Sequence, residues 1–210
     1  MSNRRVAVDD ERLRRQIAFV LEIDQLKDVL RRSYRLSESG RENSAEHSWH
    51  LVMMAIVLGE HADEPIDLLH TLKMLAVHDL VEIDAGDTFV YDHADDAAVQ
   101  AAKNEKEQRA ADRVFGLLPD DQTDSIHDLW REYETRATAE ARFAHTLDRL
   151  MPLLHNVHTA GRSWREHGVV ASQVRALHAT SGEGSRILGD YTQALIEEAV
   201  SKGFLSDEEP

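Results

Sequence analysis

Residues 66–87 read IDLLHTLKMLAVHDLVEIDAGD, and this stretch carries both the helical pattern of the chain and its densest group of titratable side chains. Its apolar residues recur at the three- and four-residue spacing of a helix that faces a core, with Leu72 and Leu75 on the buried side. Titratable residues then follow in close succession, beginning with His78 and Asp79. The pattern predicts a helix that enters the core and ends among carboxylates.

These titratable residues share one patch if the helix continues through them. His78 and Glu82 are then i,i+4 neighbours, and Asp79 and Glu82 are i,i+3 neighbours. A helix C-terminus disfavours carboxylates, because the macrodipole is negative there. Nothing local favours Asp79, Glu82 or Asp84, and a bound cation would remove the conflict. For this segment taken alone, a solvated His–Asp pair at a helix end is an equally good interpretation.

The composition is that of a globular protein with a substantial core. The chain has 210 residues, of which 42% are hydrophobic and 30% are charged. Its ten Gly and four Pro are few for this length, which disfavours a fold built from many tight β-turns. Since Cys is absent, disulfides and thiolate metal sites are excluded, and any metal must be held by His and carboxylate.

The net charge of −15 restricts the partners of the chain. Binding of long nucleic acid needs a basic surface, so this class of partner is not expected. A small anion can still bind where a metal or a few Arg side chains create local positive charge. No apolar run approaches the length of a membrane span, and MSNRRVAVDDERLRR lacks the apolar segment of a signal peptide. We therefore expect a cytoplasmic protein with a small-molecule substrate and no membrane partner.

The hydrophobic periodicity predicts an all-α fold, a single-domain helical bundle over residues 1–205. Asn43 and Glu46 have the spacing of a capping box, and Thr138 is a plausible N-cap. The tail 206–210 is expected to be disordered. The expected helices are 9–32, 44–62, 66–83, 95–115, 120–134 and 138–160, followed by C-terminal helices within about 168–203.

Two further histidines lie at the start of the apolar helix 44–62. His47 occupies its first turn, and His50 is the i,i+3 neighbour of His47. The two residues form a His-x-x-His pair, which is a competing set of metal ligands. For either residue alone, a satisfied core or cap histidine is the simpler interpretation.

Helix 138–160 carries a carboxylate on or beside its apolar stripe, at Asp148. A buried ionised carboxylate is costly unless it is paired or binds a metal. Arg142 and Arg149 are close in sequence and are the alternative partners. His145, His155 and His158 on the same helix are weaker candidates, which we expect individually at the surface.

Together these segments supply a mixed nitrogen and oxygen donor set from three helices: His47, His78, Asp79 and Asp148. Such a set suits a divalent transition metal with coordination positions left open for water. A metal of this kind lowers the pKa of water and polarises a phosphoryl oxygen. Glu82, one turn beyond His78, is placed to act as general base or acid, or to orient that water.

The ordered motifs AEHSWH (45–50), AVHDLVEIDAGD (76–87) and HTLDRL (145–150) resemble the HD-domain metal-dependent phosphohydrolase superfamily. The similarity is greatest to its bacterial 5'-deoxynucleotidase branch and the eukaryotic HD-domain-containing relatives, and it covers about residues 15–160. The resemblance implies the metal ligands His47, His78, Asp79 and Asp148, the catalytic Glu82, and the substrate-binding residues Asp87 and Arg31. Bacterial members carry Trp after the phosphate-binding Arg, where this chain has Arg32.

The resemblance implies a phosphomonoesterase that uses one divalent transition metal to activate water. The substrate would be a small phosphorylated metabolite, foremost a nucleoside or deoxynucleoside 5'-monophosphate, and the metal Mn, Co, Fe, Ni or Zn rather than Mg. One alternative is a phosphodiesterase or pyrophosphohydrolase acting on another nucleotide. Another is a non-catalytic helical module whose metal is structural or lost. Apolar helical faces left over after one core is filled also suggest a homodimer.

Overall fold

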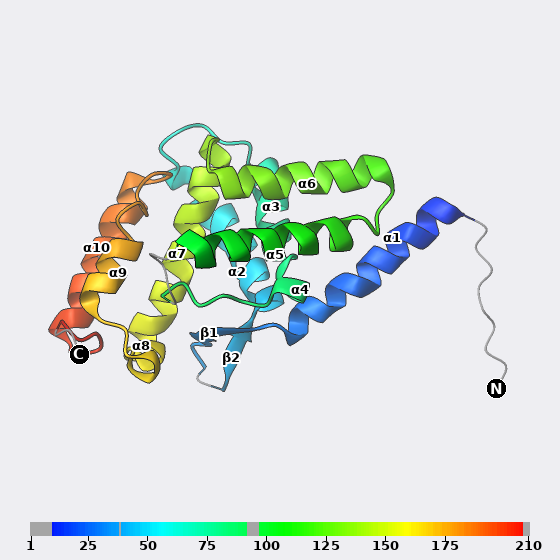
Figure 1. The fold of residues 1–210 in the computed structure, drawn as a ribbon. Coiled ribbons are helices and arrows are strands. Elements are labelled where there is room, and N and C mark those ends of the chain that lie inside the picture. Colours follow the sequence, from blue (N-terminus) through cyan, green and yellow to red (C-terminus); the bar gives the residue numbers. More distant parts are fainter. Residues whose placement is uncertain (1–9, 38, 92–96, 208–210) are drawn as a thin grey trace.

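The computed structural model describes residues 10–37, 39–91 and 97–207, and these residues form a largely helical structure (Figure 1). The predicted all-α class is confirmed, and a small antiparallel pair of strands, β1 (Leu30–Tyr34) and β2 (Arg41–Asn43), is added to it. The helices are α1 (Glu11–Glu22), α2 (Ser44–Leu58), α3 (Leu68–Val77), α4 (Glu82–Ala85), α5 (Ala97–Phe115), α6 (Asp120–Thr135), α7 (Ala139–His158), α8 (Arg162–His167), α9 (Ala171–Leu177) and α10 (Arg186–Ser201). Short 3-10 segments lie at Ile23–Asp28 (η1) and Gly59–His61 (η2).

Two helices that carry predicted site residues begin at the caps that the sequence indicates. The Asn43 side chain accepts from the Glu46 backbone N–H at 2.9 Å, and Glu46 accepts from the Asn43 N–H at 3.1 Å, which completes a capping box. Thr138 Oγ1 accepts from the Ala141 N–H at 3.2 Å at the start of α7. These caps define where α2 and α7 begin, and therefore which turn holds each site residue.

The helix expected over 9–32 is shorter than predicted, because α1 ends at Glu22 and the chain continues through η1 into β1. The backbone around β1 bonds to β2 rather than along a helix; for example, the Ser44 N–H donates to the Val29 carbonyl at 3.0 Å. Arg31 therefore lies on a strand. This placement brings its guanidinium to Asp79, two residues beyond the end of α3.

The helix expected over 66–83 is interrupted where the titratable residues begin. α3 ends at Val77, and the Leu80 and Glu82 N–H groups donate to carbonyls three residues earlier, at 3.0 and 2.9 Å. These tight turns replace the continuous helix and lead into α4, whose C-cap is Gly86 with a φ of 72°. His78 and Asp79 therefore lie on a compact turn and Glu82 begins α4, rather than all three lying on successive turns of one helix.

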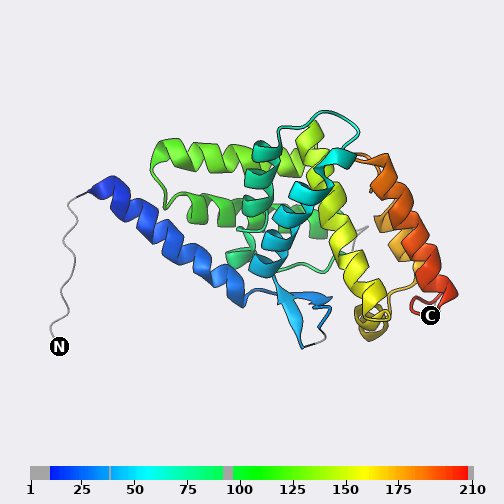
Figure 2. The same ribbon diagram turned by 180° about the vertical axis from the view of Figure 1, so that it is seen from behind.

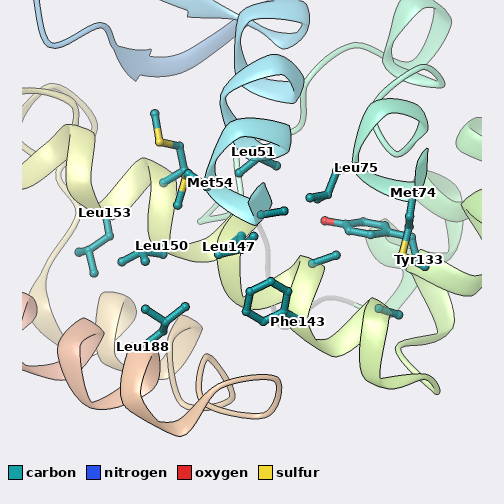
Figure 3. Packing of buried hydrophobic residues seen from close by; sticks show 14 of the residues in the cluster. Leu51, Met54, Met74, Leu75, Tyr133, Phe143, Leu147, Leu150, Leu153 and Leu188 are labelled. Carbon is teal, nitrogen blue, oxygen red and sulfur yellow. The ribbon is translucent and has the colours of Figure 1, made fainter. Parts of the chain in front are cut away.

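Helix α7 lies between α2 and α10 (Figure 2), and many of its side chains belong to the hydrophobic core. Its Phe143, Leu147 and Leu150 are buried against α2, α3 and α10, as the close-up of the core shows (Figure 3). Because neighbours surround α7 on several sides, polar residues along it are enclosed as well. None of the described helices combines the length and the apolar composition needed to cross a membrane.

The last described residues pack against the C-terminal helices. The Ala171 N–H donates to the Ser206 carbonyl at 2.8 Å, and Arg175 pairs with Asp207 at 2.8 Å. The tail predicted over 206–210 thus begins with two residues that make contacts, and its last three residues lie outside the described part of the chain.

Candidate metal centre

The first pair of predicted ligands joins α2 to α7. The His47 side chain is fully buried, with 0% exposed, and its Nε2 lies 2.9 Å from Asp148 Oδ1. The other carboxylate oxygen of Asp148 accepts from the Tyr133 hydroxyl at 2.9 Å. Arg142, one of the alternative partners for Asp148, instead donates to Glu64 at 2.5 Å. The buried carboxylate is therefore held by a histidine and a tyrosine.

The second histidine presents one ring nitrogen with a lone pair and no partner. His78 Nδ1 lies 2.8 Å from the Leu75 carbonyl oxygen, which can only accept, so Nδ1 carries the proton. His78 Nε2 is then the acceptor atom, and within the described residues it has no hydrogen-bond partner although it is buried. It lies 3.2 Å from Asp79 Oδ1, which also cannot donate when ionised. A cation between these two atoms would satisfy both.

The predicted ligands converge in the structure. One donor atom from each of His47, His78 and Asp79 lies within 4.8 Å of the others, and Asp148 joins the group through His47. Two imidazoles and two carboxylates fit a divalent transition metal, and the orphaned nitrogen of His78 is an independent sign of a missing ligand. That these residues bind a metal stays a prediction.

Three carboxylates surround a single guanidinium beside this group. Arg31 Nη1 lies 2.8 Å from Asp79 Oδ2, 3.7 Å from Glu82 Oε1 and 3.9 Å from Asp87 Oδ1. Burial and the Asp79 carboxylate raise the pKa of Glu82 to about 8, although Arg31 and the hydrogen bond from Ser44 oppose the shift. Burial also raises the pKa of Asp87. One Arg does not offset this negative charge, which leaves the site electrostatically suited to a further cation.

The carboxylates around His47 favour the positively charged form of its ring, in which both nitrogens carry a proton. Burial and Arg31 lower the pKa of His47, but the carboxylates of Asp148 and Glu42 outweigh them and raise it to about 9. Burial would raise the pKa of Asp148, yet its hydrogen bond with His47 brings it well below the usual value. A cation on His47 Nε2 would take the place of this proton, because metal ligands must be deprotonated.

The site opens onto a pocket that is largely apolar. Arg31, Asp87 and Asp148 line both this pocket and the acidic cavity that contains His78 and Glu82. Arg32 lies at the wall of the pocket, where its guanidinium is 5.8 Å from the Phe89 ring centroid and 3.1 Å from His167 Nε2. The apolar and aromatic residues that line the pocket are Phe89, Val90, Tyr91, Pro152, Leu153, Trp164 and Leu177.

Several residues around the site were missed at the sequence level. Tyr133 donates to Asp148, the Ser44 hydroxyl donates to Glu82 Oε2 at 2.5 Å, and Glu42 Oε2 lies 3.4 Å from His47 Nδ1. No sequence signal separates Tyr133 or Ser44 from similar residues elsewhere, whereas Glu42 stands next to a recognisable capping box and so close to His47.

The weaker histidines of α7 differ from one another. His158 is exposed, as expected, but His155 is 3% exposed, so its predicted surface position is wrong. His145 is half-buried and stacks on Tyr133 with ring centroids 4.0 Å apart. The reason for both differences is the enclosure of α7 by its neighbours.

Comparison with known proteins agrees with this geometry. The family model described as HD domain matches residues 23–185. The 5'-deoxynucleotidase HDDC2 of Homo sapiens is 29% identical over 139 residues, which are 66% of this chain and 65% of that protein. The protein of the same name from Xenopus laevis is 31% identical over 140 residues, 66% of each chain. The chain thus spans about two thirds of the length of these curated relatives.

A solved structure gives the same result. It is the crystal structure of a predicted metal-dependent phosphohydrolase from Magnetospirillum magnetotacticum MS-1, with 49% sequence identity and a TM-score of 0.87. The similarity covers 94% of this chain and 100% of that one. The family indicated by the ordered His, His-Asp and Asp motifs is thereby confirmed, and the chain belongs to the HD-domain family.

Proposed function

We propose that this chain is a metal-dependent phosphomonoesterase whose substrate is a nucleoside or deoxynucleoside 5'-monophosphate. The observation that carries the proposal is the convergence of His47, His78, Asp79 and Asp148 beside a buried arginine, in a chain that is otherwise strongly acidic. The names of the relatives, 5'-deoxynucleotidase and metal-dependent phosphohydrolase, support the same reaction class.

The four converging side chains would hold one divalent transition metal. His78 offers Nε2, since its other ring nitrogen is bonded to the Leu75 carbonyl, and His47 offers Nε2, which now faces Asp148. When bound, a divalent cation supplies Lewis-acid charge that polarises a phosphoryl oxygen and lowers the pKa of water. The donor set of nitrogen and oxygen atoms favours Mn, Co, Fe, Ni or Zn over Mg.

Arg31 binds the phosphate of the substrate in this proposal. Its side chain is only 12% exposed and is already oriented by Asp79, and a planar fork of N–H donors matches phosphate oxygens. Positive charge at the neighbouring ligand cluster favours the ionised form of Glu82. The Glu82 carboxylate, positioned by Ser44, then accepts a proton from the attacking water as the new oxygen–phosphorus bond forms. The bond to the 5' oxygen breaks, the proton held by Glu82 passes to that oxygen, and the products are a nucleoside and inorganic phosphate.

The adjoining apolar pocket is proposed to receive the rest of the nucleotide. Phe89, Tyr91 and Trp164 offer aromatic surface for a base, and they line the same pocket as Arg31. Asp87 lines the same pocket 3.9 Å from the phosphate-binding Arg31, where its carboxylate can accept a hydrogen bond from a sugar hydroxyl. Arg32 stands at the wall of the pocket, so the sugar and base preference depends on its contacts with Phe89 and His167.

Release of inorganic phosphate from a panel of nucleotides would test the function. The protein is stripped of metal, loaded separately with Mn²⁺, Co²⁺, Zn²⁺ or Mg²⁺, and assayed with ribo- and deoxyribonucleoside 5'-monophosphates. Cyclic and polyphosphorylated nucleotides form the second arm of the panel. Turnover confined to this second arm would contradict monoesterase chemistry, and no turnover with any metal would contradict the proposal as a whole.

We also propose a homodimer, because α1 and α2 each expose an apolar stripe. On α2 the stripe includes Trp49, with 64% of its surface exposed, and Val57, with 65%; on α1 it includes Leu21, with 69%. Sedimentation at several protein concentrations would report a dimer if these faces associate, and a monomer at all concentrations would contradict it. The cytoplasmic location stays a prediction from the sequence.

A further inference from the structure

A second group of metal-ligating side chains lies on the far side of His47 from Asp148. We propose that Glu42, His50 and His155 form a second binding site for a divalent transition metal such as Zn²⁺. The site is separate from the donor set of His78 and Asp79, and it does not depend on which substrate the chain hydrolyses.

The three side chains come from three different elements. Glu42 lies on β2, His50 on α2 and His155 on α7, and one donor atom from each lies within 4.8 Å of the other two. Donor atoms of a tetrahedral zinc site with bonds near 2.1 Å are roughly 3.4 Å apart, so small side-chain rotations would bring these atoms onto one ion. Two imidazoles and one carboxylate leave a fourth position for water, the donor set of many zinc centres.

Two of the donor atoms are buried and lack partners, which indicates a missing ligand. Glu42 is 2% exposed and His155 is 3% exposed. Glu42 Oε2 and His155 Nδ1 are 3.7 Å apart, too far for a hydrogen bond, and Glu42 Oε2 also lies 3.4 Å from His47 Nδ1. Among the described residues, neither Glu42 Oε2 nor His155 Nδ1 has a partner that meets hydrogen-bond geometry. A buried polar atom without a well-formed hydrogen bond is costly, and a cation between these two atoms would satisfy both.

The third ligand gives the ion a route to the site. His50 is half-buried, and its ring centroid lies 6.2 Å from that of His155. An ion can therefore enter beside His50 and reach the two enclosed donors behind it.

Glu42 also links the two clusters. Its Oε2 lies 3.4 Å from His47 Nδ1, while His47 Nε2 faces Asp148. An ion held by Glu42 fixes the carboxylate that faces the His47 ring, and carboxylates behind a ligating histidine orient that ring.

The competing explanation is a metal-free arrangement in which Glu42 accepts hydrogen bonds from both His47 and His155 after small rotations.

Metal stoichiometry separates these explanations without an activity assay. The full chain is stripped with a chelator, saturated with Zn²⁺, freed of loose ions on a desalting column and measured by elemental mass spectrometry. We expect His50→Gln and His155→Gln each to hold one Zn²⁺ per chain fewer than the native protein. The matched control His158→Gln, an exposed histidine on the same helix, should retain the native content. His78→Gln should lose the other ion and keep this one.

The outcome can overturn the proposal in two ways. A native content that neither His50→Gln nor His155→Gln reduces would place any second ion elsewhere, and a native content of one Zn²⁺ that His78→Gln abolishes would exclude this site. His50→Gln guards against misfolding, because its side chain is only half-buried, and circular dichroism confirms that each variant is folded. Failure of the phosphatase assay alone leaves this stoichiometry, and so the proposal, intact.

Discussion

His47 Nε2 and Asp148 Oδ1 lie 2.9 Å apart, although 101 positions separate the two residues in the chain. The contact exists because α2 packs directly against α7 in the core. The candidate metal centre is therefore a product of helix packing, and the buried side chains that hold α2 on α7 also hold two of its donors in place.

Replacing Asp148 tests this contact directly. Asp148→Asn keeps the shape of the side chain and its hydrogen bond with Tyr133 but removes the negative charge. We expect metal affinity to fall at least 10- to 100-fold, the loss typical even of residues behind the ligands. Calorimetric titration with Mn²⁺ or Co²⁺ measures the change, and Asp128→Asn on the exposed face of α6 is the matched control. Equal affinity in Asp148→Asn and native protein would remove Asp148 from the ligand set.

Replacing Arg31 with Lys tests phosphate binding while keeping the positive charge at this position. Arg31→Lys retains a cation among Asp79, Glu82 and Asp87 but loses the planar fork. The loss of one charge-assisted hydrogen bond, about 1.5 to 3 kcal/mol, corresponds to a decrease in kcat/KM of roughly 10- to 100-fold. Steady-state kinetics with a nucleoside monophosphate measures it. Arg131→Lys, an exposed substitution on α6, should have no effect, and a kcat/KM that Arg31→Lys leaves unchanged would place the phosphate elsewhere.

Glu82 distinguishes an enzyme from a metal-stabilised helical module. Glu82→Gln can still accept the hydrogen bond from Ser44 but cannot take a proton from water. We expect kcat to fall about 10²- to 10⁴-fold, the usual contribution of general acid–base catalysis, with metal content preserved. Glu105→Gln, on the exposed surface of α5, is the control. If kcat is the same in Glu82→Gln and native protein, the proposed role of Glu82 in proton transfer is wrong.

The elements that the sequence predicts well are those with local signals. The capping residues Asn43 and Thr138 mark the beginnings of α2 and α7, because their side chains bond to backbone groups within the same turn. The β1–β2 hairpin was not predicted, since its two short strands are mostly polar and lack an alternating apolar pattern. The hairpin is held by its own backbone ladder and by packing against α2, α7 and α8, and neither leaves a pattern in the sequence.

The site also contains residues that the sequence predicts and residues that it does not. The four proposed ligands stand in recognisable motifs, but the turn at 78–81 depends on how α3 meets the core, and a periodic pattern does not reveal where a helix breaks. His155 was expected at the surface because polar residues on one amphipathic helix usually face water. It is buried because α7 is enclosed by α2 and α10, and β2 brings Glu42 to it.

The pH dependence of stability tests His178, which lines the apolar pocket and is not one of the proposed metal ligands. Burial, reinforced by Arg149, lowers the pKa of His178 from its ordinary 6.5 to about 4. Between these two values the unfolded chain binds more protons than the folded one, so the free energy of unfolding falls as the pH is lowered through this window. At about pH 4, this shift in pKa corresponds to roughly 3 kcal/mol of lost unfolding free energy. Above pH 6.5 this contribution is fully present.

His178→Asn isolates that contribution, because the Asn amide does not titrate and can replace the hydrogen bond between the ring nitrogen Nδ1 and Ser181 Oγ, which lie 3.0 Å apart. Urea unfolding from pH 8 to pH 4.5 should show the native protein losing stability relative to the variant as the pH falls, by roughly 1.4 kcal/mol for each unit below 6.5. Other buried groups such as His145 affect both proteins alike and cancel in the difference. His158→Asn, which is exposed, should follow the native curve. A stability difference between native and His178→Asn protein that is constant with pH would mean that His178 titrates normally in the folded chain.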